Sequence, residues 1–370
     1  MQSGSVATDR ILATYRIAAS ESESRVRADA LAAEQSVEMP IAVIGDPRVL
    51  EEIVARVESI RPHAGEFDVV LGIAPATTGY EASQLLNMLF GNCSLQPEVE
   101  LVDVSFPPGY EKAFPGPRFG IEGIRQATGV HGRALTCTAL KPQGSTVEYL
   151  AHLAHSFALA GIDVIKDDHG LADQSYSPFG ERVPAVQSAI AEANAETGGR
   201  TIYAPTFSGG PAALRAQARV AKDHGVRMAL IAPMLVGIPA FIEAQVDIDI
   251  PIMAHPAFGG AARIAPSLLL GKLFRLFGAD ATIFPNHGGR FSYSRATCMA
   301  IAAAARGHWD DVRPALPVPA GGMTVERVEE MVAGYGNDTM LLIGGGLLSA
   351  GARLLETSRE FVRKVGGQTP

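Results

Sequence analysis

The sequence predicts an α/β protein, a (β/α)8 TIM barrel preceded by a small N-terminal α+β domain of the ferredoxin-like type. Eight short apolar runs recur between residues 134 and 346, spaced by amphipathic or Ala-rich segments of helix length. Runs that are apolar on both faces suit strands covered by helices, and eight such units over this length match one barrel. Polar residues and glycines also collect directly after these runs, at the positions that form the mouth of a barrel.

The predicted barrel strands are residues 134–140, 162–166, 201–205, 227–233, 250–256, 281–286, 315–322 and 340–346. The residues that follow them include Lys141, the segment 166–169, His255, the pair 286–287, the pair 321–322 and the triplet 344–346. Enzymes with this fold place their chemistry at the mouth where the strands end, so the clustering predicts an enzyme.

The N-terminal part alternates apolar extended runs with helical stretches, which indicates a separate α+β domain. The extended runs are residues 11–17, 41–45, 67–75 and 99–107, and helices are expected up to Ala33, at 49–57 and at 82–90. The Pro-rich joint 106–117 resists regular structure, so we expect a domain of residues 1–115 and a barrel of residues 116–370.

Composition limits the classes of partner. A net charge of −8 disfavours a general nucleic-acid or anionic-membrane surface, because both require a basic face. The three cysteines lack C-x-x-C spacing, and they are interpreted as buried apolar residues rather than zinc ligands or disulfides. The sequence shows neither a signal peptide nor an apolar span of bilayer length, so a cytoplasmic protein is expected.

The segment Lys166-Asp167-Asp168-His169 is the sharpest chemical signal, because charged residues at the end of a buried strand need partners. A lysine in apolar surroundings can lose its proton and then form a carbamate, which is an oxygen ligand. A carbamate on Lys166, Asp168 and neutral His169 would balance the charge of one divalent cation. The spacing alone leaves a simple Lys–Asp ion pair equally open.

The same segment resembles the activation segment of the RuBisCO superfamily, and the chain is similar to RuBisCO-like proteins of the form IV type over most of its length. The stretch GIDVIKDD, residues 161–168, carries this resemblance. The resemblance implies that Lys166 is carbamylated and that it binds Mg²⁺, or another divalent metal, together with Asp168 and His169. Lys141, in LKPQG, looks like the lysine that abstracts the proton yielding an enediolate.

Further residues match the family at the substrate and at the subunit contact. The resemblance implies that backbone N–H groups of two glycine loops hold a substrate phosphate, at Gly321, Gly322, Gly345 and Gly346. His255 matches a histidine near the substrate. Glu34 and Asn92 resemble residues that reach a partner subunit's barrel, which implies a homodimer or a higher homo-oligomer.

Departures from the carboxylases argue against carbon dioxide fixation. His169 stands in place of a glutamate ligand, and Gln143 and Pro256 replace a lysine and a phosphate-binding arginine. The loop NHGGR, residues 286–290, replaces the loop with the lysine that orients carbon dioxide. The loss of one phosphate-binding arginine favours a substrate with a single phosphate.

Two residues of that loop are further candidates. Arg290 lies in a glycine-containing loop that would let it close over the substrate, although a solvated surface arginine is the alternative. His287 would donate to a substrate oxyanion or act as an acid or base, and capping of its strand explains it almost as well. A core histidine at His255 and ordinary tight turns at the glycines are also left open.

The proposed chemistry is the formation of an enediolate on a phosphorylated keto-sugar or keto-sugar acid beside a divalent metal. The departures at residues 166–169 and 286–290 favour decarboxylation of a sugar acid, a lyase reaction, with protonation by Lys141. The alternative is an isomerase or enolase that acts on a methylthio-ribulose-type phosphate of methionine salvage. A catalytically inactive regulatory relative and a class II aldolase are less favoured, because they do not explain the retained Lys141, Lys166 and Asp168, or the N-terminal domain.

Overall fold

The computed structural model describes residues 9–291 and 293–367, whose contacts divide them into two units. The first unit contains residues up to Pro115 together with Gly259–Leu269, and the second contains Gly116–Phe258 and the residues from Leu270 onward. Gly259–Leu269 belongs to the first unit because it pairs with strand β4, where the Leu101 N–H donates to the Arg263 carbonyl at 3.0 Å.

The first unit is an antiparallel sheet of four strands in the order β2-β3-β1-β4, with two helices between strands along the chain. Its elements are β1 (Ile11–Ile17), α1 (Glu21–Glu34), β2 (Arg56–His63), β3 (Glu66–Ile73), α2 (Ala82–Phe90) and β4 (Val99–Ser105). The sequence β-α-β-β-α-β with this strand order is the predicted ferredoxin-like arrangement.

Two local predictions in this unit are wrong. Residues 41–45, expected to be extended, contain the 3-10 helix Ile41–Val43, and the helix expected over 49–57 ends early. Strand β2 begins at Arg56 inside that expected helix. It lies at the edge of the sheet and most of its side chains are only partly buried or exposed, so it lacks the apolar alternation that marks a half-buried strand.

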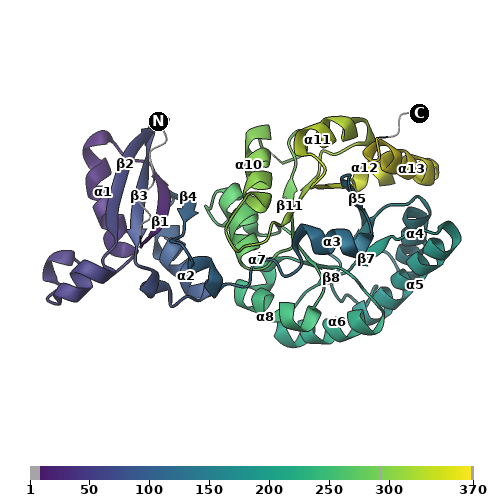
Figure 1. Ribbon diagram of the computed structural model, residues 1–370, viewed down its shortest axis with the longest axis horizontal. Coiled ribbons are helices and arrows are strands. Elements are labelled where there is room, and N and C mark those ends of the chain that lie inside the picture. The colour runs from purple at the N-terminus through teal and green to yellow at the C-terminus, as the bar shows by residue number, and fades with distance from the viewer. Residues whose placement is uncertain (1–8, 292, 368–370) are drawn as a thin grey trace. The chain divides into compact units, whose positions relative to one another are not determined.

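The second unit is a parallel sheet in the order β7-β6-β5-β13-β12-β11-β10-β9-β8, surrounded by helices (Figure 1). Its strands are β5 (Leu135–Leu140), β6 (Val164–Asp167), β7 (Ile202–Ala204), β8 (Thr206–Phe207), β9 (Ala229–Ile231), β10 (Ile252–Ala254), β11 (Ala281–Pro285), β12 (Leu316–Ala320) and β13 (Met340–Leu342). Its helices are α3 (Gly120–Thr128), α4 (Val147–Leu159), α5 (Phe179–Thr197), α6 (Pro211–Asp223), α7 (Pro233–Val236), α8 (Ile238–Ile248), α9 (Phe274–Leu276), α10 (Arg295–Arg306), α11 (Val328–Tyr335), α12 (Gly345–Leu348) and α13 (Leu354–Val365).

The sheet closes into a barrel at Pro205. Strands β7 and β8 stand at opposite ends of the strand order, yet Pro205 alone separates them along the chain. Proline has no N–H to give to a ladder, so the chain pairs with β6 before Pro205 and with β9 after it, and β8 extends beyond the predicted strand of residues 201–205. Each of the eight predicted strands is therefore present, which confirms the predicted fold class.

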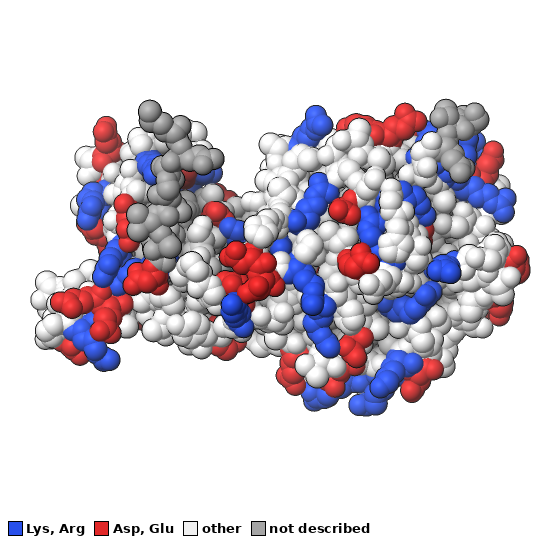
Figure 2. Space-filling view, in the orientation of Figure 1, with Lys and Arg blue, Asp and Glu red and all other residues white. Residues whose placement is uncertain are grey.

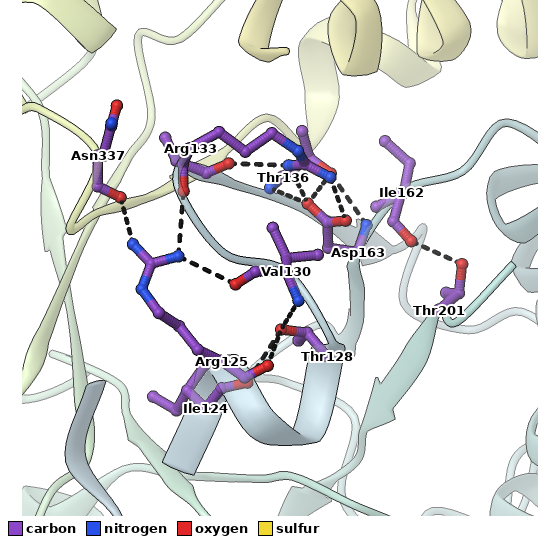
Figure 3. Close-up of polar contacts among 11 residues, drawn as sticks. Ile124, Arg125, Thr128, Val130, Arg133, Thr136, Ile162, Asp163, Thr201 and Asn337 are labelled. Atoms are coloured by element: carbon purple, nitrogen blue, oxygen red, sulfur yellow. Dashed lines mark hydrogen bonds and ion pairs between the residues drawn. The ribbon is translucent and has the colours of Figure 1, made fainter. Parts of the chain in front are cut away.

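The barrel interior is filled by side chains from every part of the sheet, such as Leu135, Val164, Met253 and Val318. At the end where the strands begin, polar contacts tie neighbouring elements together (Figure 3). The Asp163 carboxylate accepts hydrogen bonds from Arg133 at 2.7 and 2.8 Å and from the Thr136 N–H at 2.8 Å. This end of a barrel serves stability, and the chemistry belongs at the opposite end.

Charged side chains are interspersed over the described surface of the barrel unit that Figure 2 shows, without a broad area of one sign. Within the described residues, no helix has both the length and the apolar character needed to cross a membrane.

Candidate active site

The barrel brings the predicted residues to the mouth where the strands end. Lys141 follows β5 directly, and Lys166 and Asp167 end β6, with Asp168 and His169 next along the chain. His255, the segment 286–287, Gly321 and Gly344 follow strands β10, β11, β12 and β13. Because all these strands are parallel, the residues share one end of the barrel.

Asp168 lies at the centre of this group. Its Oδ2 accepts a hydrogen bond from the Lys141 amine at 2.5 Å, and its Oδ1 lies 2.8 Å from Nδ1 of His169. Burial alone would raise the pKa of Asp168, but the hydrogen bonds from His169 and Lys141 outweigh it and hold the pKa well below its usual range. The Asp168 carboxylate is therefore ionised and shared by two neighbours.

The rings of His169 and His255 stack with centroids 4.4 Å apart and planes within 5°. Nδ1 of His255 accepts a hydrogen bond from the Ala257 N–H at 3.1 Å, which places the proton of the neutral ring on Nε2. Burial, which disfavours the charged ring, lowers the pKa of His255 to about 2. His255 is thus a neutral imidazole that stacks on His169, the neighbour of Asp168.

Lys166 is only 4% exposed, and its amine donates to the main-chain carbonyl of Asp167 at 2.9 Å. Burial lowers the pKa of this amine, because a charged ammonium is poorly solvated there. The lysine expected to become a carbamate is therefore one whose amine loses its proton more readily than that of an exposed lysine. A neutral amine is the form that reacts with carbon dioxide.

The Asp167 carboxylate is fully buried and holds the segment 166–169 in place through hydrogen bonds to neighbouring elements. Its carboxylate accepts hydrogen bonds from the Tyr203 hydroxyl at 2.6 Å, the Thr206 N–H at 3.0 Å and Arg182 Nε at 3.2 Å. Arg182 is fully buried and also donates to the carbonyl of Ala172, in the loop that follows His169. Sequence reasoning did not find Arg182 or Tyr203, since nothing in local spacing links them to Asp167.

Asp168 and His169 supply two potential metal ligands of the predicted three. Among the residues that the structure describes, no group of three or more His, Cys, Asp or Glu side chains is arranged to hold a metal. Unmodified Lys166 supplies no anionic oxygen. A three-ligand site at this point therefore depends on a modification of Lys166.

Two glycine loops touch each other at the ends of β11 and β12. A Cβ on Gly322 would lie 2.4 Å from the Cα of Gly289, and Gly322 has a φ of +63°. Only glycine permits this backbone approach. After β13, a Cβ on Gly344 would meet Lys141 Cε at 3.8 Å, while Gly345 has open space beside its Cα. The predicted phosphate loops thus lie next to Lys141 on one side and next to the loop after β11 on the other.

His287 sits in a polar cluster that the sequence did not reveal. Its Nε2 lies 3.2 Å from both Glu330 Oε1 and Arg327 Nη2, and Arg327 also pairs with Glu330. Arg327 and Glu330 come from the segment after β12, so their sequence positions give no sign of this contact. Arg290 is exposed, with its guanidinium 5.0 Å from the Phe291 ring, and its predicted role over the substrate stays a prediction.

Glu34 and Asn92 lie in the first unit and contact each other. The Asn92 amide donates to Glu34 Oε1 and Glu38 Oε1, at 2.9 Å each, in exposed surroundings. The pair is held together by structure, and its predicted reach to a second subunit stays a prediction.

Comparison with known proteins identifies the family. Residues 120–264 match the family model described as the ribulose bisphosphate carboxylase large chain, catalytic domain. The chain is 52% identical to ribulose bisphosphate carboxylase-like protein 1 of Rhodopseudomonas palustris, over 97% of this chain and 98% of that one. A crystal structure of a Rubisco-like protein from the same organism has a TM-score of 0.91 at 50% identity, covering 98% of this chain and all (100%) of that one.

Two further relatives have names that state an activity. The 5-methylthioribulose-1-phosphate isomerase of Rhodospirillum rubrum is 51% identical over 97% of each chain. The 2,3-diketo-5-methylthiopentyl-1-phosphate enolase of Geobacillus kaustophilus is 37% identical over 75% of this chain and 70% of that one. These similarities confirm the expectation of an enzyme. The chain belongs to the RuBisCO large-chain superfamily, as one of its RuBisCO-like proteins.

Proposed function

We propose that this chain is an isomerase of 5-methylthioribulose 1-phosphate. The observation that carries the proposal is its 51% identity, over nearly the whole of both chains, to the Rhodospirillum rubrum isomerase. The named enolase is less similar and matches a smaller share of the chain, so isomerisation is preferred to enolisation. The decarboxylation favoured from the sequence has no support among these relatives, and its methionine-salvage alternative takes its place.

Lys141 is the proposed proton-transfer group. Isomerisation of a keto-sugar moves a proton between neighbouring carbons through an enediolate and adds or removes no atoms. Lys141 stands at the mouth beside Asp168 and close to the loop after β13, where a substrate between the glycine loops would meet its amine. Transfer by a positioned group of this kind contributes about 10²- to 10⁴-fold to a rate.

A divalent cation, Mg²⁺ in this proposal, would supply positive charge that stabilises the enediolate. The donor set fits: Asp168 is ionised, His169 offers an imidazole, and the buried amine of Lys166 favours the neutral form that becomes a carbamate. Asp168 is already paired with Lys141, so it would turn from that amine to the cation. His255 stays neutral and stacks on His169, which fixes the plane of that ring.

The phosphate is assigned to the loops after β12 and β13. Gly321, Gly322, Gly345 and Gly346 have no side chain to cover their N–H groups, and the space beside Gly321 and Gly345 is open. Loops at these two strand positions recurrently bind phosphate in TIM barrels. A substrate anchored there by one phosphate would lie beside Lys141.

A substrate panel tests this proposal. The purified chain is incubated with Mg²⁺ and bicarbonate and offered either 5-methylthioribulose 1-phosphate or phosphorylated β-keto sugar acids, with products followed by ¹³C NMR. We expect conversion of the first compound with every carbon retained, and loss of this activity when the metal is chelated. Carbon dioxide release from a sugar acid, with the first compound unchanged, would replace the isomerase with a decarboxylase.

We also infer a homodimer in which Glu34 and Asn92 complete the active site of the other protomer. The support is the family resemblance of these residues, together with the exposed position of their hydrogen bond. Mixing inactive Lys141→Met chains with inactive Asn92→Ala chains separates the possibilities. Hybrid dimers regain activity when the site is shared between chains, and regain none when each chain carries its whole site.

A further inference from the structure

We propose that Arg327 is a positioning residue that fixes the proton of His287 on Nδ1, so that His287 donates a hydrogen bond to an oxygen of the phosphorylated substrate. This inference rests on the proposed function for the identity of the acceptor. The placement of the proton follows from contacts of the described residues alone.

The Arg327 guanidinium carries five N–H groups, which can only donate. Two Nη1 bonds reach main-chain carbonyls, of His287 at 3.1 Å and of Gly322 at 2.7 Å. Nε and Nη2 bind the two carboxylate oxygens of Glu330, at 3.1 and 3.2 Å. The remaining Nη2 proton faces Nε2 of His287, 3.2 Å away. Every donor of Arg327 thus has an acceptor.

This arrangement decides which ring nitrogen of His287 is protonated. Since Arg327 cannot accept, Nε2 must offer a lone pair to it, and the proton of the neutral ring is then on Nδ1. Glu330 Oε1 also lies 3.2 Å from Nε2, and would by itself favour the opposite tautomer. A proton on Nε2 would point at the Nη2 proton of Arg327 as well, setting one donor against another. Glu330 already accepts two hydrogen bonds from Arg327 and is half-exposed to water, so a further hydrogen bond from His287 would add little.

The resulting Nδ1–H group of His287 can donate a hydrogen bond. Nδ1 of His287 is a buried polar atom for which no partner is found among the described residues. An unpaired buried donor is costly, and it is satisfied when a molecule that binds at this place offers an oxygen to it. His287 stands directly after β11 at the barrel mouth, where that molecule would be the substrate. A hydrogen-bond donor at Nδ1 would bind an oxygen of that substrate.

Arg327 also joins the loop after β11 to the loop after β12. It binds the carbonyl of His287 in one loop and that of Gly322 in the other, and a Cβ on Gly288 would come within 3.0 Å of its Nη1. The backbones of Gly289 and Gly322 meet beside it. One side chain therefore sets the position of the His287 ring and of a predicted phosphate loop.

The tautomer is measured first, by ¹⁵N NMR of protein labelled at histidine, with the His287 signals assigned through His287→Asn. We expect the protonated, pyrrole-type resonance at Nδ1 in the wild-type chain. Arg327→Met leaves Glu330 as the partner of Nε2 and is expected to move the proton to Nε2. Glu330→Gln keeps an oxygen for Arg327 and is expected to leave the proton on Nδ1. A wild-type proton on Nε2, or an unchanged tautomer in Arg327→Met, would overturn the positioning role. Replacing an arginine with a purely structural role would not move the proton of His287.

Kinetics of the isomerase reaction then test the donor. Asparagine places an amide N–H near the position of Nδ1, whereas aspartate at the same place offers oxygens that only accept. We expect His287→Asp to lower kcat/KM about 10- to 100-fold more than His287→Asn, as the loss of one hydrogen bond to a charged oxygen predicts. Equal losses in the two variants would exclude a donor role for Nδ1. Arg359→Gln, an exposed arginine of α13, is the control for loss of positive charge.

The two proposals fail separately. If the wild-type chain does not convert 5-methylthioribulose 1-phosphate, the proposed function is wrong, and the NMR result still stands or falls without it. If conversion occurs and the proton of His287 lies on Nε2, the isomerase survives and the assignment of Arg327 is wrong.

Discussion

The amine of Lys141 lies 2.5 Å from Oδ2 of Asp168, so the proposed proton-transfer group and a proposed metal ligand form an ion pair. A single carboxylate oxygen cannot fully serve both an ammonium and a metal cation. Cation binding and release of Lys141 are thereby linked, and each can be measured without turnover.

Replacement of Lys141 by methionine is expected to tighten binding of Mn²⁺, a spectroscopic substitute for Mg²⁺. The variant removes a positive charge that competes for Asp168, and about a tenfold gain in affinity corresponds to about 1.4 kcal/mol. Titration calorimetry or electron paramagnetic resonance measures the affinity. Lys222→Met, at an exposed position in α6, is the matched control, and equal affinities in the two variants would mean that Lys141 does not compete.

Lys166→Met is expected to abolish any effect of bicarbonate on metal binding. Wild-type protein should bind Mn²⁺ more tightly after incubation with bicarbonate, because a carbamate on Lys166 adds an anionic oxygen ligand. Methionine has a similar length and cannot form a carbamate. A bicarbonate effect that persists in the variant would place the modification elsewhere, and its absence in the wild type would remove the carbamate altogether.

The buried pair of Arg182 and Asp167 is expected to matter far more for stability than an exposed pair. Both side chains are 0% exposed, and Arg182→Met would leave a buried carboxylate without its cation, a loss of about 3–5 kcal/mol. Arg215→Met breaks the exposed pair with Glu243 and should cost less than about 1 kcal/mol. Urea unfolding measures the free energy of unfolding of both variants. An equally small loss in Arg182→Met and Arg215→Met would show that the ion pair of Arg182 with Asp167 adds little stability.

His255 should make the protein less stable as the pH falls below about 6.5, the ordinary pKa of histidine. Its folded-state pKa is lowered to about 2, so the unfolded chain binds a proton in this range that the folded chain does not. The loss is up to about 1.4 kcal/mol per pH unit for one proton. Unfolding of wild-type and His255→Gln protein in urea between pH 7 and pH 5 measures it, and parallel pH dependences would contradict burial of a neutral His255.

Local sequence was sufficient to predict the barrel and to place the candidate residues at one end of it. The strand that ends in Lys166 is apolar on both faces, and the charges after it are conspicuous because they interrupt such a run. The prediction failed at β2, which lies at a sheet edge. Its side chains are partly buried or exposed, so its sequence lacks the apolar alternation that predicts a strand.

Contacts between distant strands were beyond the sequence. In the sequence, Asp167 and Asp168 are adjacent carboxylates that nothing distinguishes as metal ligands. In the structure, the Asp167 carboxylate is bound by Tyr203, 36 positions away, and by Arg182. The pairing of His287 with Arg327, 40 positions away, is set by adjacency of β11 and β12 and not by any spacing. Side-chain roles that depend on closure of the barrel could therefore be assigned only from the structure.

Exchange in deuterium oxide shows whether Lys141 moves a proton on a methylthioribulose phosphate. Wild-type protein with Mg²⁺ and bicarbonate is given 5-methylthioribulose 1-phosphate, and ¹H NMR follows both isomer formation and loss of the proton next to the carbonyl. We expect both in the wild type and neither in Lys141→Met, with Lys222→Met unaffected. Isomerisation that continues in Lys141→Met, or a wild-type chain that leaves the substrate proton in place, would rule out proton transfer by Lys141.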